Sequence, residues 1–389
     1  EAAVDPAALD AAHRRYAAER DAALPTDHRG HRPTGGVGGA RRGVKCLHAH
    51  LAWFLAGGQD PVGRWVADRV GLGGDGERPR GAVAAVDCGT NSTRLLVMGA
   101  EGRALRRLMR ITRLGQGVDA AGRLDEEALR RTMSVLGEYR GEMDRLGVTS
   151  VRVSATSAVR DAANREEFLA AATDQVGARP ELLTGEEEGR LAYAGATACL
   201  DATGGPYVVV DVGGGSTEII VGTQPGEAGC PEVVSIDMGC VRVSERFLHH
   251  DPPQPAEVAT ARAAIDRELD RVLEVLPGAA GARRVVGLAG TVSALAAIHQ
   301  GLDHYERDRL HHVLLAREDV ASMLATLAGE PRTARVARPG LEEERADVIV
   351  GGTLVLATVM TRLGASECLV SEADLLDGLA RSLLDIGAT

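Results

Sequence analysis

Hydrophobic and polar positions along the chain predict an α/β protein. Short apolar runs, typical of buried strands, alternate with longer stretches in which apolar residues recur at the three- and four-residue spacing of one helix face. The predicted strands cover 83–87, 95–99, 105–112, 151–155 and 181–184, and the order restarts at Tyr207. The predicted helices include 164–172, 186–199, an apolar helix around 346–360, and one with Leu129, Met133, Leu136, Met143 and Leu146 on a single face. Strand-turn-helix units are also predicted at 285–298 and 367–379. Such alternation is typical of layered α/β domains.

Residues before 83 follow a different pattern. We expect a helix over 7–23, a loop rich in Gly, Pro and His to about residue 43, and further short helices ending at Val70. The glycine-rich stretch 71–81 is the best linker in the sequence. The predicted organisation is an N-terminal domain at 1–72, a linker at 73–82, a first lobe at 83–205 and a second lobe at 206–389.

Two stretches of the chain repeat each other. Residues 86–97 read VDCGTNSTRLLV and residues 210–221 read VDVGGGSTEIIV, so Asp87 corresponds to Asp211, and the same offset relates Gly115 to Gly239. Each copy runs from an apolar strand through an Asp and a Gly/Ser/Thr turn into a second strand, which predicts a hairpin. The repeat therefore predicts two related lobes with a cleft between them.

The composition of each hairpin turn indicates a phosphate site. Glycines free backbone N–H groups to point at one spot, hydroxyls add donors, and an Asp can hold a hydrated Mg²⁺. Two hairpins face to face would hold one polyphosphate from both sides. Two ordinary glycine-rich hairpins are the alternative, and agreement in register over so many positions argues against it. The predicted phosphate donors are Gly89, Thr90, Asn91, Ser92, Gly213, Gly214, Gly215, Ser216 and Thr217.

Composition excludes several function classes. The net charge of −11 and the pI of about 5.5 disfavour nonspecific nucleic-acid binding, so local donors and metal must hold any polyanion. Lys45 is the single lysine, which excludes a Walker-A lysine and, outside the N-terminal segment, Schiff-base chemistry. The six cysteines include no C-x-x-C pair, as expected in a reducing cytoplasm. No apolar run approaches the roughly 20 residues of a membrane span, and no signal peptide is evident.

The N-terminal segment is rich in metal-ligand residue types. They are His13, His28, His31, Cys46, His48 and His50. A zinc site is one hypothesis. Loop and helix-surface histidines are the favoured alternative, because His48 and His50 would point to different faces of a helix.

Several motifs together carry a family resemblance. They are DCGTNSTR at 87–94, ATSAVRDAAN at 155–164, GEEEGR at 185–190, DVGGGSTE at 211–218, GLAGT at 287–291 and RADVIVGG at 345–352. In this order they resemble the exopolyphosphatase / guanosine pentaphosphate phosphohydrolase family, in its short form. The resemblance implies two duplicated lobes of the actin-like (ribonuclease H-like) ATPase superfamily with a cleft between them. The first 70 or so residues resemble the C-terminal part of a small bacterial family of unknown function.

The resemblance also implies roles for individual residues. Glu188 matches the family's catalytic base and Glu218 its second essential acid, while Arg94 and Arg160 match phosphate contacts. Asp87, Asp211 and Glu218 would bind Mg²⁺ or Mn²⁺, because three buried carboxylates beside a phosphate chain need a cation. The local sequence alone does not distinguish Glu188 from Glu186 and Glu187. An acidic first helical turn, favoured by the helix dipole, is the structural alternative.

The expected activity is release of terminal orthophosphate from inorganic polyphosphate, from guanosine pentaphosphate, or from both. In-line attack of water activated by Glu188 would suffice, with no covalent intermediate. Two alternatives stay open: a phosphotransferase (kinase) of the same superfamily, and a non-catalytic alarmone or polyphosphate sensor. The expected partners are the substrate and, as one option, a second copy of the chain in a homodimer. No membrane and no sequence-specific nucleic acid are expected.

Overall fold

The computed structural model describes residues 81–386 except 202–204, 224–230 and 283. The chain divides into two units, Glu1–Arg78 and Pro79–Thr389, and the described residues all lie in the second. The helices and the zinc alternative predicted for the N-terminal segment therefore lie outside the described residues.

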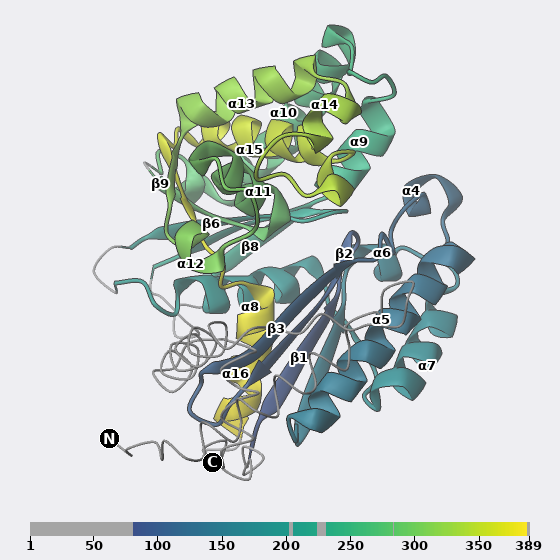
Figure 1. Cartoon of the computed structure of the whole chain (residues 1–389). Helices are drawn as coiled ribbons and strands as arrows, with labels where there is room; N and C mark the ends of the chain where they lie inside the picture. Colours follow the sequence, from purple (N-terminus) through teal and green to yellow (C-terminus); the bar gives the residue numbers. More distant parts are fainter. Residues whose placement is uncertain (1–80, 202–204, 224–230, 283, 387–389) are drawn as a thin grey trace, which may run out of the picture. The chain divides into compact units, whose positions relative to one another are not determined.

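The first lobe is built on a five-stranded sheet with the order β3-β2-β1-β4-β5. Its strands are β1 (Val83–Cys88), β2 (Ser92–Met98), β3 (Ala104–Ile111), β4 (Ser150–Ala155) and β5 (Glu181–Leu182). β1, β2 and β3 are antiparallel neighbours, and β4 and β5 continue the sheet in parallel. Helices α5 (Glu126–Arg145) and α7 (Arg165–Val176) lie together beside the sheet (Figure 1). Their buried Tyr139 and Phe168 share one core with Val86 and Leu95.

The second lobe repeats this topology and adds a strand. Its order is β10-β11-β9-β6-β7-β8. The strands are β6 (Tyr207–Val212), β7 (Thr217–Gly222), β8 (Glu232–Ile236), β9 (Arg284–Leu288), β10 (Leu314–Ala316) and β11 (Glu367–Val370). β6, β7 and β8 pair as β1, β2 and β3 do, and β9 and β11 continue in parallel as β4 and β5 do. The predicted α/β fold with two duplicated lobes is confirmed.

Helices of the second lobe form its outer layer and its largest core. The main ones are α9 (Cys240–Phe247), α10 (Pro255–Val275), α11 (Ala289–Gln300), α13 (Arg317–Gly329) and α15 (Ile349–Leu363). The short helices of the described residues are α4 (Val118–Ala121), α6 (Ser157–Arg160), α12 (Arg307–Leu310) and α14 (Arg332–Val336). α15 is almost entirely buried, which explains why its sequence is apolar on every side.

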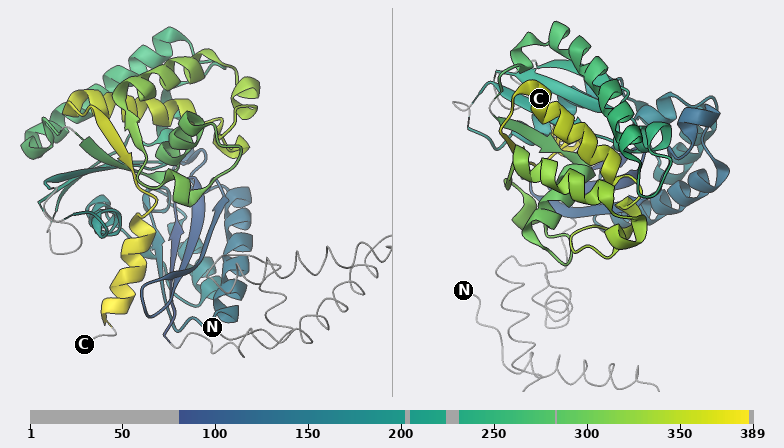
Figure 2. Two further views of the ribbon diagram at one scale, coloured as in Figure 1. Left: turned by 60° about the vertical axis from the view of Figure 1, so that its left-hand side comes forward. Right: turned by 90° about the horizontal axis from the view of Figure 1, so that it is seen from above.

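Two helices, α8 (Gly185–Thr197) and α16 (Leu375–Ile386), connect the lobes. They share a core with residues from the inner faces of both sheets, including Leu96 of β2 and Ile220 of β7. α16 follows the second-lobe strand β11 in sequence, yet it packs beside α8, β1 and β2. Figure 2 shows this yellow helix running alongside the strands of the first sheet. Elements of both lobes thus fix the position of α8.

Glycines allow α8 and α16 to cross at close range. A methyl group added to Gly378 would clash with the carbonyl oxygen of Leu191, and one added to Gly195 would clash with the carbonyl oxygen of Asp374. Because both obstacles are backbone atoms, no side-chain rotation relieves the clash. The distance between the two helices therefore depends on these glycines.

We expect Gly378→Ala to lower the free energy of unfolding by about 1–3 kcal/mol, the usual cost of overpacking a buried contact. Gly141→Ala is the matched control, because Gly141 lies in helix α5 with open space where its Cβ would be. That substitution should raise stability by roughly 0.5–1 kcal/mol through helix propensity. Urea unfolding of the two variants measures both effects. Equal stability changes of the same sign would contradict the close crossing.

Candidate active site

The tips of the β1–β2 and β6–β7 hairpins are each held by the segment that follows the third strand of the same lobe. The Gly115 N–H donates to the Thr90 carbonyl (2.8 Å), and the Val241 N–H donates to the carbonyl of the corresponding Gly214 (2.8 Å). The two tips also touch each other, since a methyl group on Gly214 would lie 2.7 Å from Cβ of Thr90. The two tips thus approach each other closely at Thr90 and Gly214, and the expected grip on a phosphate from both sides stays a prediction.

The lobes differ in the charges carried by their hairpins. In the first lobe Asp87 lies opposite Arg94, and at the same register in the second lobe Asp211 lies opposite Glu218. Arg94 donates to Asp87 Oδ2 from Nε (3.1 Å) and Nη2 (2.8 Å), while the Ser154 hydroxyl donates to Asp87 Oδ1 (3.0 Å). Asp87 is therefore neutralised within its own lobe.

The second-lobe pair forms no such ion pair among the described residues. Glu218 is 1% exposed, and its Oε1 accepts a hydrogen bond from the Ser235 hydroxyl (2.7 Å), while its Oε2 has no partner among the described residues. Like charges directly opposite each other destabilise a sheet. Burial, followed by the charge of Glu218, raises the pKa of Asp211 well above its ordinary value. The pair formed by Asp211 and Glu218 thus favours binding of a proton or a cation.

The three consecutive glutamates at the start of α8 have different surroundings. Glu186 is exposed and pairs with Arg190 (2.6 Å), one turn along the helix. Glu187 forms a capping box with Thr184, and those hydrogen bonds lower the pKa of Glu187. Glu188, in contrast, is 9% exposed, and its Oε2 has no hydrogen-bond partner among the described residues.

A glycine explains why Glu188 comes so close to the second sheet. A methyl group on the adjacent Gly189 would clash with Val233 of β8, so glycine lets α8 lie against that sheet. Burial raises the pKa of Glu188 well above its ordinary value, and the charges of Glu218 and Asp87 add to the shift. The carboxylates of Glu188, Glu218 and Asp87 therefore lie near enough to interact electrostatically.

One predicted donor, Arg160, lies beside Glu188, and another, Asn91, lies at the first hairpin tip. Arg160 Nη1 lies 4.0 Å from Glu188 Oε2 and donates to the carbonyl of Leu183 (2.7 Å). Asn91 is buried at the first hairpin tip, and its Nδ2 has no acceptor among the described residues. A buried amide without an acceptor is costly, so this Nδ2 is suited to donate to a ligand or a water molecule. Thr217 differs, because its hydroxyl donates to the carbonyl of Met238 (2.8 Å).

Sequence reasoning missed three polar residues at the site. Ser154 and Ser235 hold the carboxylates of Asp87 and Glu218, and Asp374 binds Arg94 through Nη1. The sequence around Asp374 carries a helix N-terminus signal, an Asp followed three residues later by another acid before an apolar run. That signal predicts a cap but not a partner far away in sequence.

Within the described ranges, no three His, Cys, Asp or Glu side chains are grouped so that they could hold a metal ion by themselves. This arrangement is compatible with Mg²⁺, which keeps several waters and binds through one or two carboxylates together with substrate phosphates. The Oε2 atom of Glu218 has no hydrogen-bond partner among the described residues, and the pKa of Asp211 is raised, so these two carboxylates are compatible with a nearby cation. The metal set of Asp87, Asp211 and Glu218 stays a prediction.

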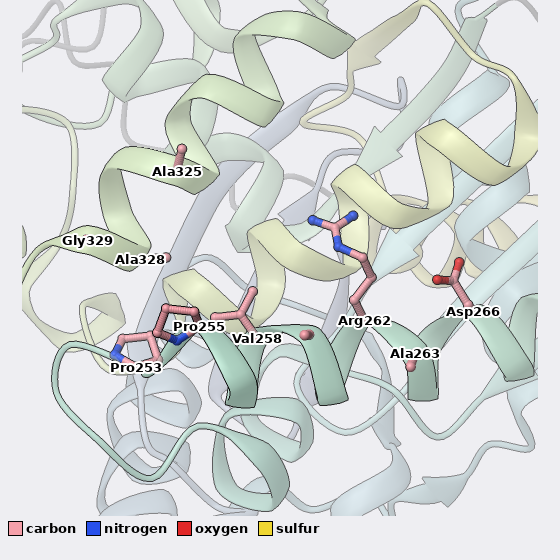
Figure 3. A pocket seen from close by; sticks show the side chains of 10 residues that line it. Pro253, Pro255, Val258, Arg262, Ala263, Asp266, Ala325, Ala328 and Gly329 are labelled. Carbon is pink, nitrogen blue, oxygen red and sulfur yellow. The ribbon is translucent and has the colours of Figure 1, made fainter.

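A pocket of about 550 Å³ lies elsewhere, between α10 and α13 (Figure 3). Its lining includes Pro253, Val258 and Ala325, with Arg262 and Asp266 at its side. None of the predicted site residues lines it. Its apolar surface is unsuited to a phosphate chain, so it does not alter the assignment of the site.

The fold and the paired hairpins define an α/β protein with the architecture of phosphate-handling enzymes. The chain matches the Ppx/GppA phosphatase family over residues 98–386, and a family of unknown function, DUF501, over residues 4–68. The chain belongs to the Ppx/GppA phosphatase family, and both resemblances predicted from the motifs are confirmed.

Curated relatives agree with this assignment. Exopolyphosphatase 2 of Mycobacterium tuberculosis is 42% identical over 320 residues, which are 77% of this chain and 98% of the relative. A bifunctional 3-dehydroquinate synthase/phosphatase of Fusobacterium nucleatum is 26% identical over 306 residues, which cover 76% of this chain and 45% of that protein.

Solved structures confirm the actin-like fold. An exopolyphosphatase-like protein aligns with a TM-score of 0.73 at 33% identity, covering 79% of this chain and 99% of the other. A Ppx/GppA family member from Aquifex aeolicus aligns with a TM-score of 0.65 at 32% identity, covering 79% and 99%. Among the described residues, no helix is both long enough and apolar enough to cross a membrane.

We expect Glu188→Gln to raise the melting temperature of the metal-free protein, and more at pH 8 than at pH 5. A carboxyl whose pKa is raised in the folded state binds more protons folded than unfolded, so its ionisation costs stability as pH rises above about 4.3. The variant lacks this penalty. Each kcal/mol added to the free energy of unfolding should raise Tm by roughly 2–4 °C.

Thermal melts in EDTA at the two pH values measure the effect. Glu186→Gln is the control, since it makes the same substitution at an exposed carboxylate of the same helix. A Tm difference between wild type and Glu188→Gln that is the same at both pH values would contradict the buried, repelled carboxylate.

Proposed function

We propose that this chain is a hydrolase that releases terminal orthophosphate from inorganic polyphosphate, from guanosine pentaphosphate, or from both. The observation that carries the proposal is the Oε2 of the buried Glu188, which accepts no hydrogen bond from the described residues and lies near Glu218 and Arg160. A buried carboxylate oxygen without a donor can accept a hydrogen bond from a water molecule. The name of the 42% identical relative, an exopolyphosphatase, supports the substrate class.

In the proposed reaction Glu188 orients a water molecule and accepts its proton as the water attacks the terminal phosphorus in line. The P–O bond to the next phosphate breaks, and orthophosphate leaves with the water oxygen. Arg94 supports this step because two of its five N–H groups remain without a partner among the described contacts. Arg160 and the Asn91 amide would add donors to the terminal phosphoryl oxygens.

We propose that Asp211 and Glu218 hold Mg²⁺ or Mn²⁺, with Asp87 contributing from the opposite lobe. The cation would supply charge neutralisation for the phosphate oxygens. The cation would also relieve the repulsion between Asp211 and Glu218. Its positive charge would lower the pKa of the neighbouring Glu188 toward the range of a general base. Because Asp87 already accepts from Arg94 and Ser154, its share in such a site would be the smallest of the three.

The proposed site does not use the N-terminal segment. All its residues lie between Asp87 and Asp374, so we propose that 83–205 and 206–389 form the catalytic lobes and that 1–72 is a separate domain. We also propose a cytoplasmic location, which is consistent with the free thiols of Cys88, Cys199, Cys240 and Cys368.

We expect Glu188→Gln to lower kcat by roughly 10²–10⁴-fold, the usual share of a general base, with little change in KM. Orthophosphate release would be measured side by side on long polyphosphate, tripolyphosphate, guanosine pentaphosphate and ATP. Glu186→Gln should retain near-normal turnover. Near-normal turnover in Glu188→Gln, with Glu187→Gln inactive, would assign the base to the neighbouring residue.

The same assay separates the alternatives. Transfer of phosphate from ATP to an acceptor without orthophosphate release would favour a kinase, and tight binding without turnover would favour a sensor. Either result would overturn the proposed hydrolase.

We expect hydrolysis to require Mg²⁺ or Mn²⁺, because Asp211 and Glu218 form no ion pair among the described residues and would face an anionic substrate. Excess EDTA should abolish phosphate release, and added Mg²⁺ should restore it. Full activity in EDTA would refute the metal assignment.

A further inference from the structure

The helix that ends the described chain, α16, begins with two interlocked carboxylates. Asp374 Oδ1 accepts from the Leu376 N–H (2.9 Å), and Asp377 Oδ2 accepts from the Asp374 N–H (3.0 Å). These bonds satisfy orphan donors at the helix start and fix both side chains. Asp374 is 6% exposed and Asp377 is 7% exposed. Neither carboxylate is free to rotate toward solvent.

Each of these carboxylates also binds an arginine of the first sheet. Asp377 Oδ1 accepts from Arg107 Nη2 of β3 (2.6 Å), and Asp374 Oδ2 accepts from Arg94 Nη1 of β2. Burial alone would raise the pKa of Asp374, but Arg94 and Arg107 outweigh it and lower that pKa. The two carboxylates at the start of α16 thus bind arginines of two neighbouring strands, β2 and β3.

Arg94 is held from two directions. Asp87 binds its Nε and Nη2 edge, and Asp374 binds Nη1, so the plane of the guanidinium is fixed. If only Asp87 bound it, the Arg94 guanidinium could still rotate. The planar guanidinium recognises a phosphate specifically only when its orientation is fixed. The backbone of Asp374 also packs against Gly195 of α8, the helix that carries Glu188.

We infer that Asp374 is a positioning residue for phosphate hydrolysis, which aims the guanidinium of Arg94 at the transferred phosphoryl group. The inference rests on the proposed function, and it assigns to α16 a role in the reaction besides packing. Displacement of a charge-stabilising group by about 1 Å can cost 10²-fold in rate. The effect should appear in kcat more than in KM, because charge on the phosphoryl oxygens changes most in the transition state.

Asp374→Asn and Asp377→Asn form a matched pair for the test. Each removes one buried ion pair from the same helix start and keeps an oxygen for the cap, but only Asp374 binds Arg94. We expect Asp374→Asn to lower kcat on long polyphosphate by about 10–100-fold, and Asp377→Asn to stay within about threefold of wild type. Equal losses of kcat in the two variants would reduce Asp374 to a structural role.

A double-mutant cycle with Arg94→Ala makes the coupling explicit. If Asp374 acts through Arg94, Asp374→Asn should have no further effect on kcat in the Arg94→Ala background. Independent, multiplicative losses would overturn the inference. Should Asp374→Asn unfold, Asp374→Ser retains a capping side chain without the carboxylate and takes its place.

A readout without turnover separates this inference from the proposed function. In crystal structures of the full chain, Arg94 should turn away from its wild-type position in Asp374→Asn and keep it in Asp377→Asn. An unmoved Arg94 in Asp374→Asn would overturn the inference even if the enzyme hydrolyses polyphosphate. If the wild type hydrolyses none of the tested substrates, the proposed function is overturned, and the positioning role assigned to Asp374 with it. A moved Arg94 in Asp374→Asn would still show that Asp374 holds Arg94 in place.

Discussion

The buried, opposed pair of Asp211 and Glu218 is the constraint on which the site depends. Two carboxylates facing each other across a hairpin, away from water, are stable only with a proton or a cation nearby. Glu188 lies close enough to add to this repulsion. A sheet built for stability alone would not place these side chains together, and their position supports the proposed cation.

Packing, rather than polar attraction, brings Glu188 into this cluster. Helices α8 and α16 form a shared core between the inner faces of the two sheets, and glycines at their crossing and at Gly189 allow backbone atoms to approach closely. The apolar burial in that core offsets the cost of desolvating the carboxylate. A loop would not hold such a group against the repulsion of its neighbours, whereas a helix wedged between two sheets can.

Much of this arrangement could be predicted from the sequence. The period of apolar residues identified the strands and helices, and the repeated hairpins identified the two lobes, because both signals are local or self-similar. Boundaries shifted where polar residues join a strand: β2 begins at Ser92 because Arg94 pairs with Asp87 in the ladder, although the apolar run begins at Leu95. The contact of Arg94 with Asp374 joins residues far apart in sequence, and no local pattern indicates it.

The choice among three adjacent glutamates shows the same limit. All three suit a helix N-terminus, and only the packing of α8 distinguishes them, since it exposes Glu186, uses Glu187 as a cap and buries Glu188. The two duplicated hairpins also differ from each other in charge. One register position carries Arg94 in the first lobe and Glu218 in the second, so a symmetric backbone presents one cationic and one anionic side chain. A phosphate anhydride with a bound cation carries both charges, and a site made of two identical hairpins could stabilise only one of them.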